Sequence, residues 1–133
     1  MNFHDGVIHT DRIKQVIAFE DLRFGNMHPT DIDGCIEYKD KAVIFLEYKL
    51  KDYDMPLGQQ LCLERLADNC NQAGKRAIVL LCEHETYDVS EPVKAGSAIV
   101  RAMYYNGKWI NGDGRNVKQY VAGFITYVKG ELK

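Results

Sequence analysis

Apolar residues along the chain follow two different spacings, which separate the expected strands from the expected helices. Five segments show the alternating or wholly apolar pattern of β-strands. They are residues 31–38, 42–50, 76–83, 98–105 and 108–110. Residues 42–50 are apolar on both faces over their first half, which is typical of a strand inside a sheet. The pair Asn106-Gly107 favours a tight hairpin turn between the last two segments.

Three further segments repeat apolar residues every three or four positions, as amphipathic helices do. They are residues 10–24, 54–71 and 117–128. In the first, Glu20 falls on the same stripe as Ile13 and Ile17, so we expect its carboxylate to point toward the interior. Residues 6–9 admit a short extra strand. Together the elements predict an α/β or α+β domain whose mixed sheet is flanked by helices.

Composition limits the class of protein without indicating a function. The 133 residues are 46% hydrophobic and 27% charged, which predicts one soluble globular domain spanning residues 1–133. No apolar run approaches the roughly 20 residues needed to span a bilayer, and the N-terminus lacks the features of a signal peptide. We therefore expect a cytoplasmic protein with no membrane partner. The net charge of −2 removes whole-domain basicity as an argument for nucleic-acid binding, but it leaves room for a local basic face.

The four cysteines do not form a CxxC pair; they are Cys35, Cys62, Cys70 and Cys82. Three of them lie inside apolar segments, where a free cysteine behaves as a small hydrophobic residue. We therefore expect buried free thiols. A zinc site at Cys82 and His84 is an alternative, although their spacing matches no zinc signature, and a cytosolic setting disfavours disulfides.

The segment 42–50 contains a conflict between burial and charge, because Glu47 and Lys49 lie in an otherwise apolar strand. They are two residues apart, so both side chains leave the same face. If residues 39–41 form a three-residue loop, paired positions bring Asp33 directly opposite Glu47 on that face. Their Cβ atoms would then lie about 4.5–5.5 Å apart. A two-residue loop would shift the register and remove this opposition.

Two opposed carboxylates predict a cation site, because they repel each other and one of them tends to keep a proton. A divalent cation removes that penalty, and carboxylate oxygens suit Mg²⁺ or Mn²⁺. Lys49 would flank the cation with a fixed positive charge. The simpler alternative is a surface pair of Lys49 with Asp33 or Glu47 on a half-exposed strand.

The segment PTDIDGCIEYKDKAVIFLEYK resembles the core of the PD-(D/E)XK nuclease superfamily. The matching residues are Asp33 at a strand start and, after a turn, Glu47-Tyr48-Lys49 on the next strand. Glu20 matches a glutamate that some members carry on the first helix, and Gln59 or Gln60 matches a glutamine on the helix after the lysine strand. The resemblance covers residues 13–83, and the last 50 residues add no further motif.

The resemblance implies a restriction-endonuclease-like core with an additional C-terminal hairpin and helix, as in a small bacterial or phage protein. It implies a nuclease that hydrolyses DNA with Mg²⁺, or Mn²⁺ as a substitute, held by Asp33, Glu47 and the backbone carbonyl of Tyr48. Lys49 would assist the attacking water or stabilise negative charge. Glu20 would bind a second metal or order the water shell, and Gln59, in preference to Gln60, would orient Lys49 or touch the phosphate.

Two alternatives remain beside this reading. An inactive protein of nuclease fold could bind DNA or protein, which the net acidity favours, although buried charges argue for a working site. The enzyme could also act as a homodimer or beside a partner protein.

Asp31 is more typical of a helper or solvated charge than of a ligand. The aromatic residues Tyr104, Tyr105 and Trp109 are more typical of core or dimer contacts than of a base-stacking platform.

Overall fold

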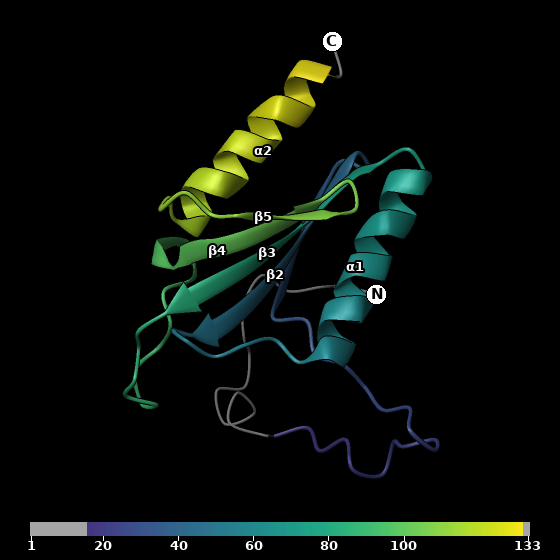
Figure 1. The fold of residues 1–133 in the computed structure, drawn as a ribbon, viewed down its shortest axis with the longest axis vertical. Helices are drawn as coiled ribbons and strands as arrows, with labels where there is room; N and C mark the ends of the chain where they lie inside the picture. The colour runs from purple at the N-terminus through teal and green to yellow at the C-terminus, as the bar shows by residue number, and fades with distance from the viewer. Residues whose placement is uncertain (1–15, 132–133) are drawn as a thin grey trace, which may run out of the picture.

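A five-stranded mixed sheet with one helix on each face forms the centre of the computed structural model, which describes residues 16–131 (Figure 1). The strands are β1 (Gly34–Tyr38), β2 (Ala42–Leu50), β3 (Arg76–His84), β4 (Ile99–Tyr105) and β5 (Lys108–Asn111). The helices are α1 (Leu57–Gln72), α2 (Val117–Glu131) and the short 3₁₀ helix η2 (Ala95–Ser97). The strands lie in chain order; β2 and β3 are parallel, and the other neighbours are antiparallel. The predicted mixed α and β architecture is therefore confirmed.

The hairpin between β1 and β2 has the predicted three-residue loop. Lys39 and Asp40 both adopt left-handed backbone conformations, with φ of 46° and 60°, and the N–H of Lys41 donates to the carbonyl of Tyr38 at 2.8 Å. Tyr38 therefore pairs with Ala42, and the ladder continues in register to the pair Gly34 and Leu46. Asp33, directly before β1, is consequently the next residue in line with Glu47.

The connection from β2 through α1 to β3 makes the two central strands parallel, as such crossovers do. Helix α1 begins directly after Pro56, a residue suited to helix starts, and is followed by Gly74 with φ of +87°. The parallel register places Glu47 beside Leu81 and Lys49 beside Glu83. Side chains on neighbouring strands at these positions share one face of the sheet.

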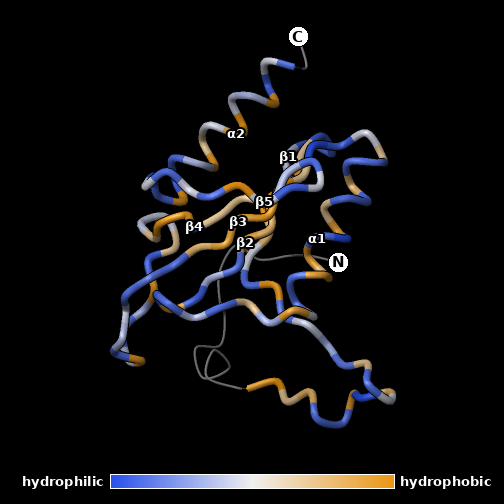
Figure 2. Tube along the Cα trace, in the orientation of Figure 1, coloured by the Kyte–Doolittle hydropathy of each residue, from blue (hydrophilic) through white to orange (hydrophobic). Residues whose placement is uncertain are grey.

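Two apolar clusters fill the space between the sheet and its helices. Ile44, Ile78, Leu80, Val100 and Val117 are buried between the sheet and α2. The opposite face packs against α1 through a second set, which comprises Phe45, Leu63, Ala67, Val79 and Tyr104. Figure 2 shows the hydrophobic colours concentrated along the strands, with hydrophilic colours over much of α1 and the loops.

The helix predicted over residues 10–24 is wrong where the structure describes it. Residues 16–24 contain no helix, and Glu20 is exposed, so the expected burial of its carboxylate is also wrong. Val16 and Ile17 are 85% and 75% exposed, and without a surface to pack on, a short amphipathic helix is only marginally stable. Residues 16–28 run outside the sheet and both long helices (Figure 1). Residues 10–15 and the strand expected near residues 6–9 lie outside the described part of the chain.

Across residues 16–131, every helix is too short or too polar to cross a membrane.

Candidate functional site

Asp33 and Glu47 meet where β1 begins and β2 approaches its end. The backbone N–H of Tyr48 donates a hydrogen bond of 2.8 Å to Oδ2 of Asp33, which holds this carboxylate against the edge of β2. Glu47 is only 2% exposed, whereas Asp33 is exposed. The opposition predicted from the three-residue loop is therefore present, with one carboxylate buried and the other open to solvent.

Lys49 is the third member of this group. Its ammonium nitrogen lies 3.3 Å from Oε1 of Glu47, and its side chain remains 23% exposed. Oε2 of Glu47 is buried, and no group among residues 16–131 forms a hydrogen bond with it. A buried carboxylate oxygen without a partner is destabilising, because it has lost water without gaining a compensating bond. Glu47 therefore has one oxygen paired with Lys49 and one oxygen still able to bind a ligand.

The surroundings of Glu47 oppose its ionisation. Burial raises the pKa of its carboxyl most, and the neighbouring Asp33 carboxylate raises it further, while Lys49 lowers it by a smaller amount. Burial also raises the pKa of the Cys82 thiol and of the Tyr48 hydroxyl to about 12 in each case. Neither of these neighbours ionises near neutral pH. The ionisable groups of the site are therefore the two carboxylates and the lysine.

Gln59 and Gln60 are adjacent in α1 but contact different parts of the molecule. The amide nitrogen of Gln59 donates to the carbonyl of Asp31 at 3.1 Å, and its buried oxygen Oε1 has no partner in the described part of the chain. The amide of Gln60 instead donates to Glu64 at 2.8 Å. Gln59 is thus the glutamine that touches the segment leading to Asp33.

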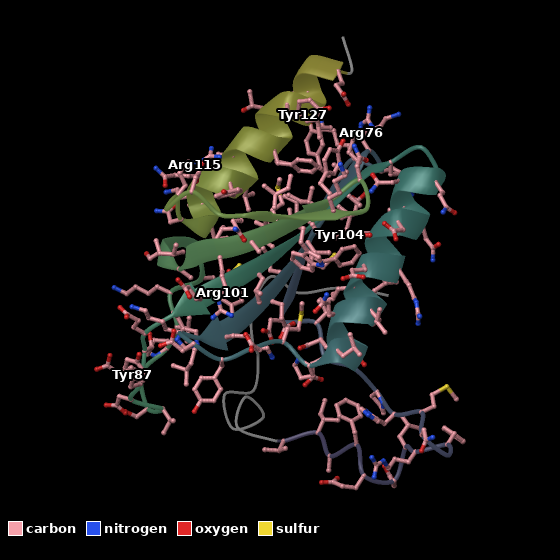
Figure 3. The ribbon with its side chains drawn as sticks, viewed as in Figure 1. Arg76, Tyr87, Arg101, Tyr104, Arg115 and Tyr127 are labelled. Atoms are coloured by element: carbon pink, nitrogen blue, oxygen red, sulfur yellow. The ribbon has the colours of Figure 1, made fainter. Side chains whose placement is uncertain are left out.

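Glu83 is a site neighbour that the sequence analysis missed. It lies beside Lys49 in the parallel register, and Nε of Arg101 donates to its carboxylate at 3.2 Å. The same guanidinium donates to the carbonyls of Tyr53 at 2.7 Å and Leu50 at 3.3 Å, so it ties β4 to the loop that leaves β2 (Figure 3). The only sequence signal for Glu83 was its polarity at the end of an apolar strand, and its position depended on an unknown register.

The donor set fits a hard divalent cation. Two carboxylates converge, one with an unpartnered oxygen, and Mg²⁺ commonly uses one or two carboxylates together with water. The N–H and C=O of a strand residue point to the same edge, so the carbonyl of Tyr48 faces the side where its N–H meets Asp33. Within residues 16–131 no group of three or more acidic, histidine or cysteine side chains converges, so Glu20 does not join the other two.

The structure does not support the zinc alternative. Cys82 is buried in the apolar cluster under α2, and Nδ1 of His84 accepts a hydrogen bond from the N–H of Thr86 at 3.2 Å. All four cysteines are free thiols. Cys82 is buried as expected, but Cys35 is exposed because β1 is an edge strand with little cover.

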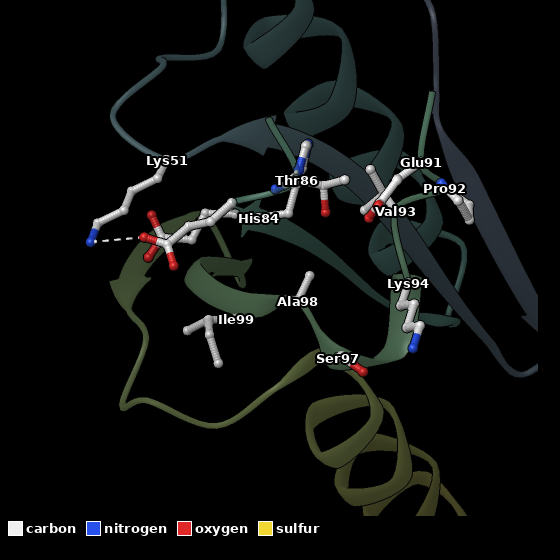
Figure 4. A pocket seen from close by; sticks show the side chains of 12 residues that line it. Lys51, His84, Thr86, Glu91, Pro92, Val93, Lys94, Ser97, Ala98 and Ile99 are labelled. Carbon is white, nitrogen blue, oxygen red and sulfur yellow. Dashed lines mark hydrogen bonds and ion pairs between the residues drawn. The ribbon is translucent and has the colours of Figure 1, made fainter. Parts of the chain in front are cut away.

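A cavity of about 450 Å³ lies beyond the C-terminal end of β3 and contains none of the predicted site residues (Figure 4). Its ionisable lining comprises three glutamates, two lysines and one histidine, namely Glu83, Glu85, Glu91, Lys51, Lys94 and His84. Lys51 is already paired with Glu85 at 3.2 Å. The excess of glutamates makes this cavity a poor site for phosphate.

Comparisons of the chain with protein-family models, curated proteins and solved structures give no match.

Proposed function

We propose that this protein is a metal-dependent nuclease that hydrolyses DNA phosphodiester bonds with a restriction-endonuclease-like site. The observation that carries the proposal is the buried Glu47 carboxylate, which has one unpartnered oxygen beside Asp33 and a lysine 3.3 Å away. Two carboxylates beside an ammonium group suit the binding of a cation and a phosphate together. A surface ion pair would explain neither the burial of Glu47 nor its orphaned oxygen.

Asp33, Glu47 and the carbonyl of Tyr48 are the groups that would hold Mg²⁺, or Mn²⁺ as a substitute. When bound there, the cation would lower the pKa of a coordinated water and neutralise charge on the phosphate. For the protein, its binding would offset the repulsion between the two carboxylates and give the unpartnered oxygen of Glu47 a ligand. Metal binding and folding stability are therefore linked in this proposal.

Lys49 and Gln59 would complete the chemistry. The partly exposed ammonium of Lys49 would orient the attacking water or stabilise negative charge as it develops on the phosphate. The amide nitrogen of Gln59 is occupied by Asp31, which leaves its oxygen as the available group. An amide oxygen accepts hydrogen bonds, so Gln59 would orient the ammonium or the water rather than bind a phosphate oxygen.

Metal binding tests the proposal most directly. We expect Mn²⁺ titrated by calorimetry to bind the wild-type protein and to lose that binding in Asp33→Ala. Asp31→Ala is the matched control, because the Asp31 side chain is exposed and the backbone carbonyl that holds Gln59 is preserved. Equal Mn²⁺ binding by wild type and Asp33→Ala would refute the assignment.

Cleavage of linear, nicked and branched DNA in Mg²⁺ and Mn²⁺ separates the enzyme from its alternative. The net charge of −2 gives some support to an inactive protein of the same fold that binds DNA or protein. Binding of DNA with no cleavage of any form in either metal would favour that alternative.

A further inference from the structure

A second cavity, of about 360 Å³, lies on the α1 face of the sheet next to the proposed site. Its lining consists of Asp54, Met55, Gln60, Leu81, Ala102 and Trp109. Leu81 is the register neighbour of Glu47, and Ala102 is the neighbour of Leu81 in β4. Adjacent strands are about 4.8 Å apart, so the floor of this cavity begins one strand away from the buried carboxylate.

The indole of Trp109 is a fixed wall of the cavity. Its Nε1 donates to Oε2 of Glu64 at 2.7 Å, and the same oxygen accepts the amide of Gln60 at 2.8 Å. The indole packs against Tyr104, with ring centroids 5.3 Å apart, and the Tyr104 hydroxyl donates to Asp68 of α1 at 2.8 Å. Figure 3 shows Tyr104 between the sheet and α1. These bonds hold the aromatic wall in place before any ligand arrives.

The chemistry of the lining selects a flat and largely apolar ligand with polar edges. Trp109, Met55, Leu81 and Ala102 supply aromatic and aliphatic walls, while Asp54 and Gln60 supply polar groups. No lysine or arginine among residues 16–131 lines this cavity, and the carboxylate of Asp54 would repel a phosphate. The volume falls in the range of about 300–1,000 Å³ that is typical of small-molecule sites. An aromatic heterocycle with exocyclic amines meets all of these conditions.

We propose that this cavity receives one unpaired nucleobase of the DNA strand whose phosphate lies beside Lys49, at the cation site formed by Asp33 and Glu47. The inference rests on the proposed nuclease function and names the class of its substrate. A base inside an intact duplex would have to leave the stack to enter, at an energetic cost that an unpaired base does not carry. The protein should therefore prefer single-stranded, frayed or branched DNA to intact duplex.

Trp109 provides a direct readout, because it is the single tryptophan of the chain and lines the cavity. The full-length protein would be titrated without Mg²⁺ or Mn²⁺ against a single-stranded oligonucleotide, a blunt duplex of equal length and an abasic strand of equal length. We expect the single strand to change the tryptophan fluorescence and to bind about 10-fold more tightly than the abasic strand, because base–aromatic stacking contributes on this scale. The duplex and the abasic strand should leave the fluorescence nearly unchanged.

Ala102→Leu fills the cavity without altering Asp33, Glu47 or Lys49. We expect it to weaken single-strand binding and cleavage about 10-fold, and to leave duplex binding unchanged. Ala122→Leu is the matched control, since Ala122 is exposed on α2, and it should behave as wild type. If circular dichroism shows that Ala102→Leu does not fold, the three wild-type titrations still decide the question.

The possible failures are distinguishable. Equal affinity for the single strand and the abasic strand, with no fluorescence change, would overturn the cavity assignment and leave the nuclease proposal standing. An equal response to free deoxyadenosine monophosphate would assign the cavity to free nucleotides and overturn its role with a DNA strand. A response specific to the single strand, without cleavage in Mg²⁺ or Mn²⁺, would refute the nuclease and support the base cavity as a binding site.

Discussion

β2 presents Ile44, Leu46 and Tyr48 to α2, and it presents Phe45, Glu47 and Lys49 to α1. On the first face the residues belong to one apolar cluster with Ile78, Leu80 and Cys82 of β3, and the described residues of this cluster carry no charge. On the second face the apolar packing stops after Phe45, and a buried carboxylate follows. The same strand therefore carries a complete core on one side and an incomplete one on the other.

The two faces differ in what their residues contribute to stability. Removing methylene groups from a closely packed apolar face typically costs about 2–5 kcal/mol. Replacing a buried ion pair by uncharged residues is often neutral or stabilising, because burial of the charges was costly from the start. Glu47 and Lys49 are thus poorly explained by folding, which directs attention to ligand binding on the α1 face.

The largest expected effect is a loss of cleavage rate when Lys49 is replaced. Lys49 lies with Glu47 on the side of β2 that faces α1, which we call the charged face. In the proposed nuclease, Lys49→Ala should lower the cleavage rate at least about 10²–10³-fold, because the ammonium would act mainly on charge that develops in the transition state. DNA affinity should fall only modestly, since one phosphate contact is a small part of the total. Single-turnover rates and affinities in Mg²⁺ measure the two effects, with thermal melts to check folding.

Lys51→Ala is the control for this change, because Lys51 is exposed and pairs with Glu85 outside the site. It should cleave as wild type does. A wild-type cleavage rate in Lys49→Ala would refute the role in cleavage that is proposed for Lys49.

Two smaller effects, opposite in sign, are expected on folding stability when Glu47 and Leu46 are replaced. These neighbouring residues lie on the two faces of β2. At pH 7 without metal, Glu47→Gln should stabilise the protein by about 1 kcal/mol, or roughly 3–5 °C in Tm, because the fold raises the pKa of the Glu47 carboxyl and so disfavours the charged form that glutamine lacks. Leu46→Ala should destabilise it by about 2–3 kcal/mol. Urea and thermal unfolding of both variants would measure the contrast.

The pH dependence of folding stability tests the buried charge of Glu47 in a second way. The pKa of Glu47 in the fold is raised above its ordinary 4.5, so the folded state binds the proton more tightly than the unfolded state does. The protonated Glu47 carboxyl therefore contributes stability below pH 4.5, and this contribution is lost as the pH rises through the raised pKa of the folded state. The stability of wild type relative to Glu47→Gln should decline over this range, and Mg²⁺ should restore it at neutral pH. Parallel pH profiles for the two proteins would contradict this account.

The smallest effect is expected at Glu20, which tests whether the charged face needs a third carboxylate. Because Glu20 is exposed and does not converge with Asp33 and Glu47, Glu20→Gln should leave the cleavage rate and Mn²⁺ affinity unchanged within about 2-fold. Steady-state rates at saturating metal would measure this. A loss of 10-fold or more would show that the segment reaches the site when DNA binds.

Local patterns were sufficient for β2 and for the hairpin before it, although β1 begins at Gly34 and leaves Asp33 outside the predicted strand 31–38. The apolar run at 42–50 matches β2 at both ends, and the turn at Asn106-Gly107 has the positive φ values of 50° and 79° that its composition predicts. The three-residue loop at 39–41 determined the hairpin register, so the opposition of Asp33 and Glu47 followed from residues close together in the chain. Such short-range features depend on backbone preferences and side-chain alternation, which a sequence displays directly.

Only the tertiary structure decided the features that depend on distant segments. Whether residues 16–24 form a helix depended on a surface against which they could pack, and the described residues provide none. The positions of Glu83 beside Lys49 and of Leu81 beside Glu47 required the register of the parallel strands, which α1 and its loops set across a long stretch of chain. The contact of Gln59 with the Asp31 carbonyl and the wall formed by Trp109 likewise depended on where α1 packs. Periodicity shows which face a residue occupies, but it does not show which distant residue shares that face.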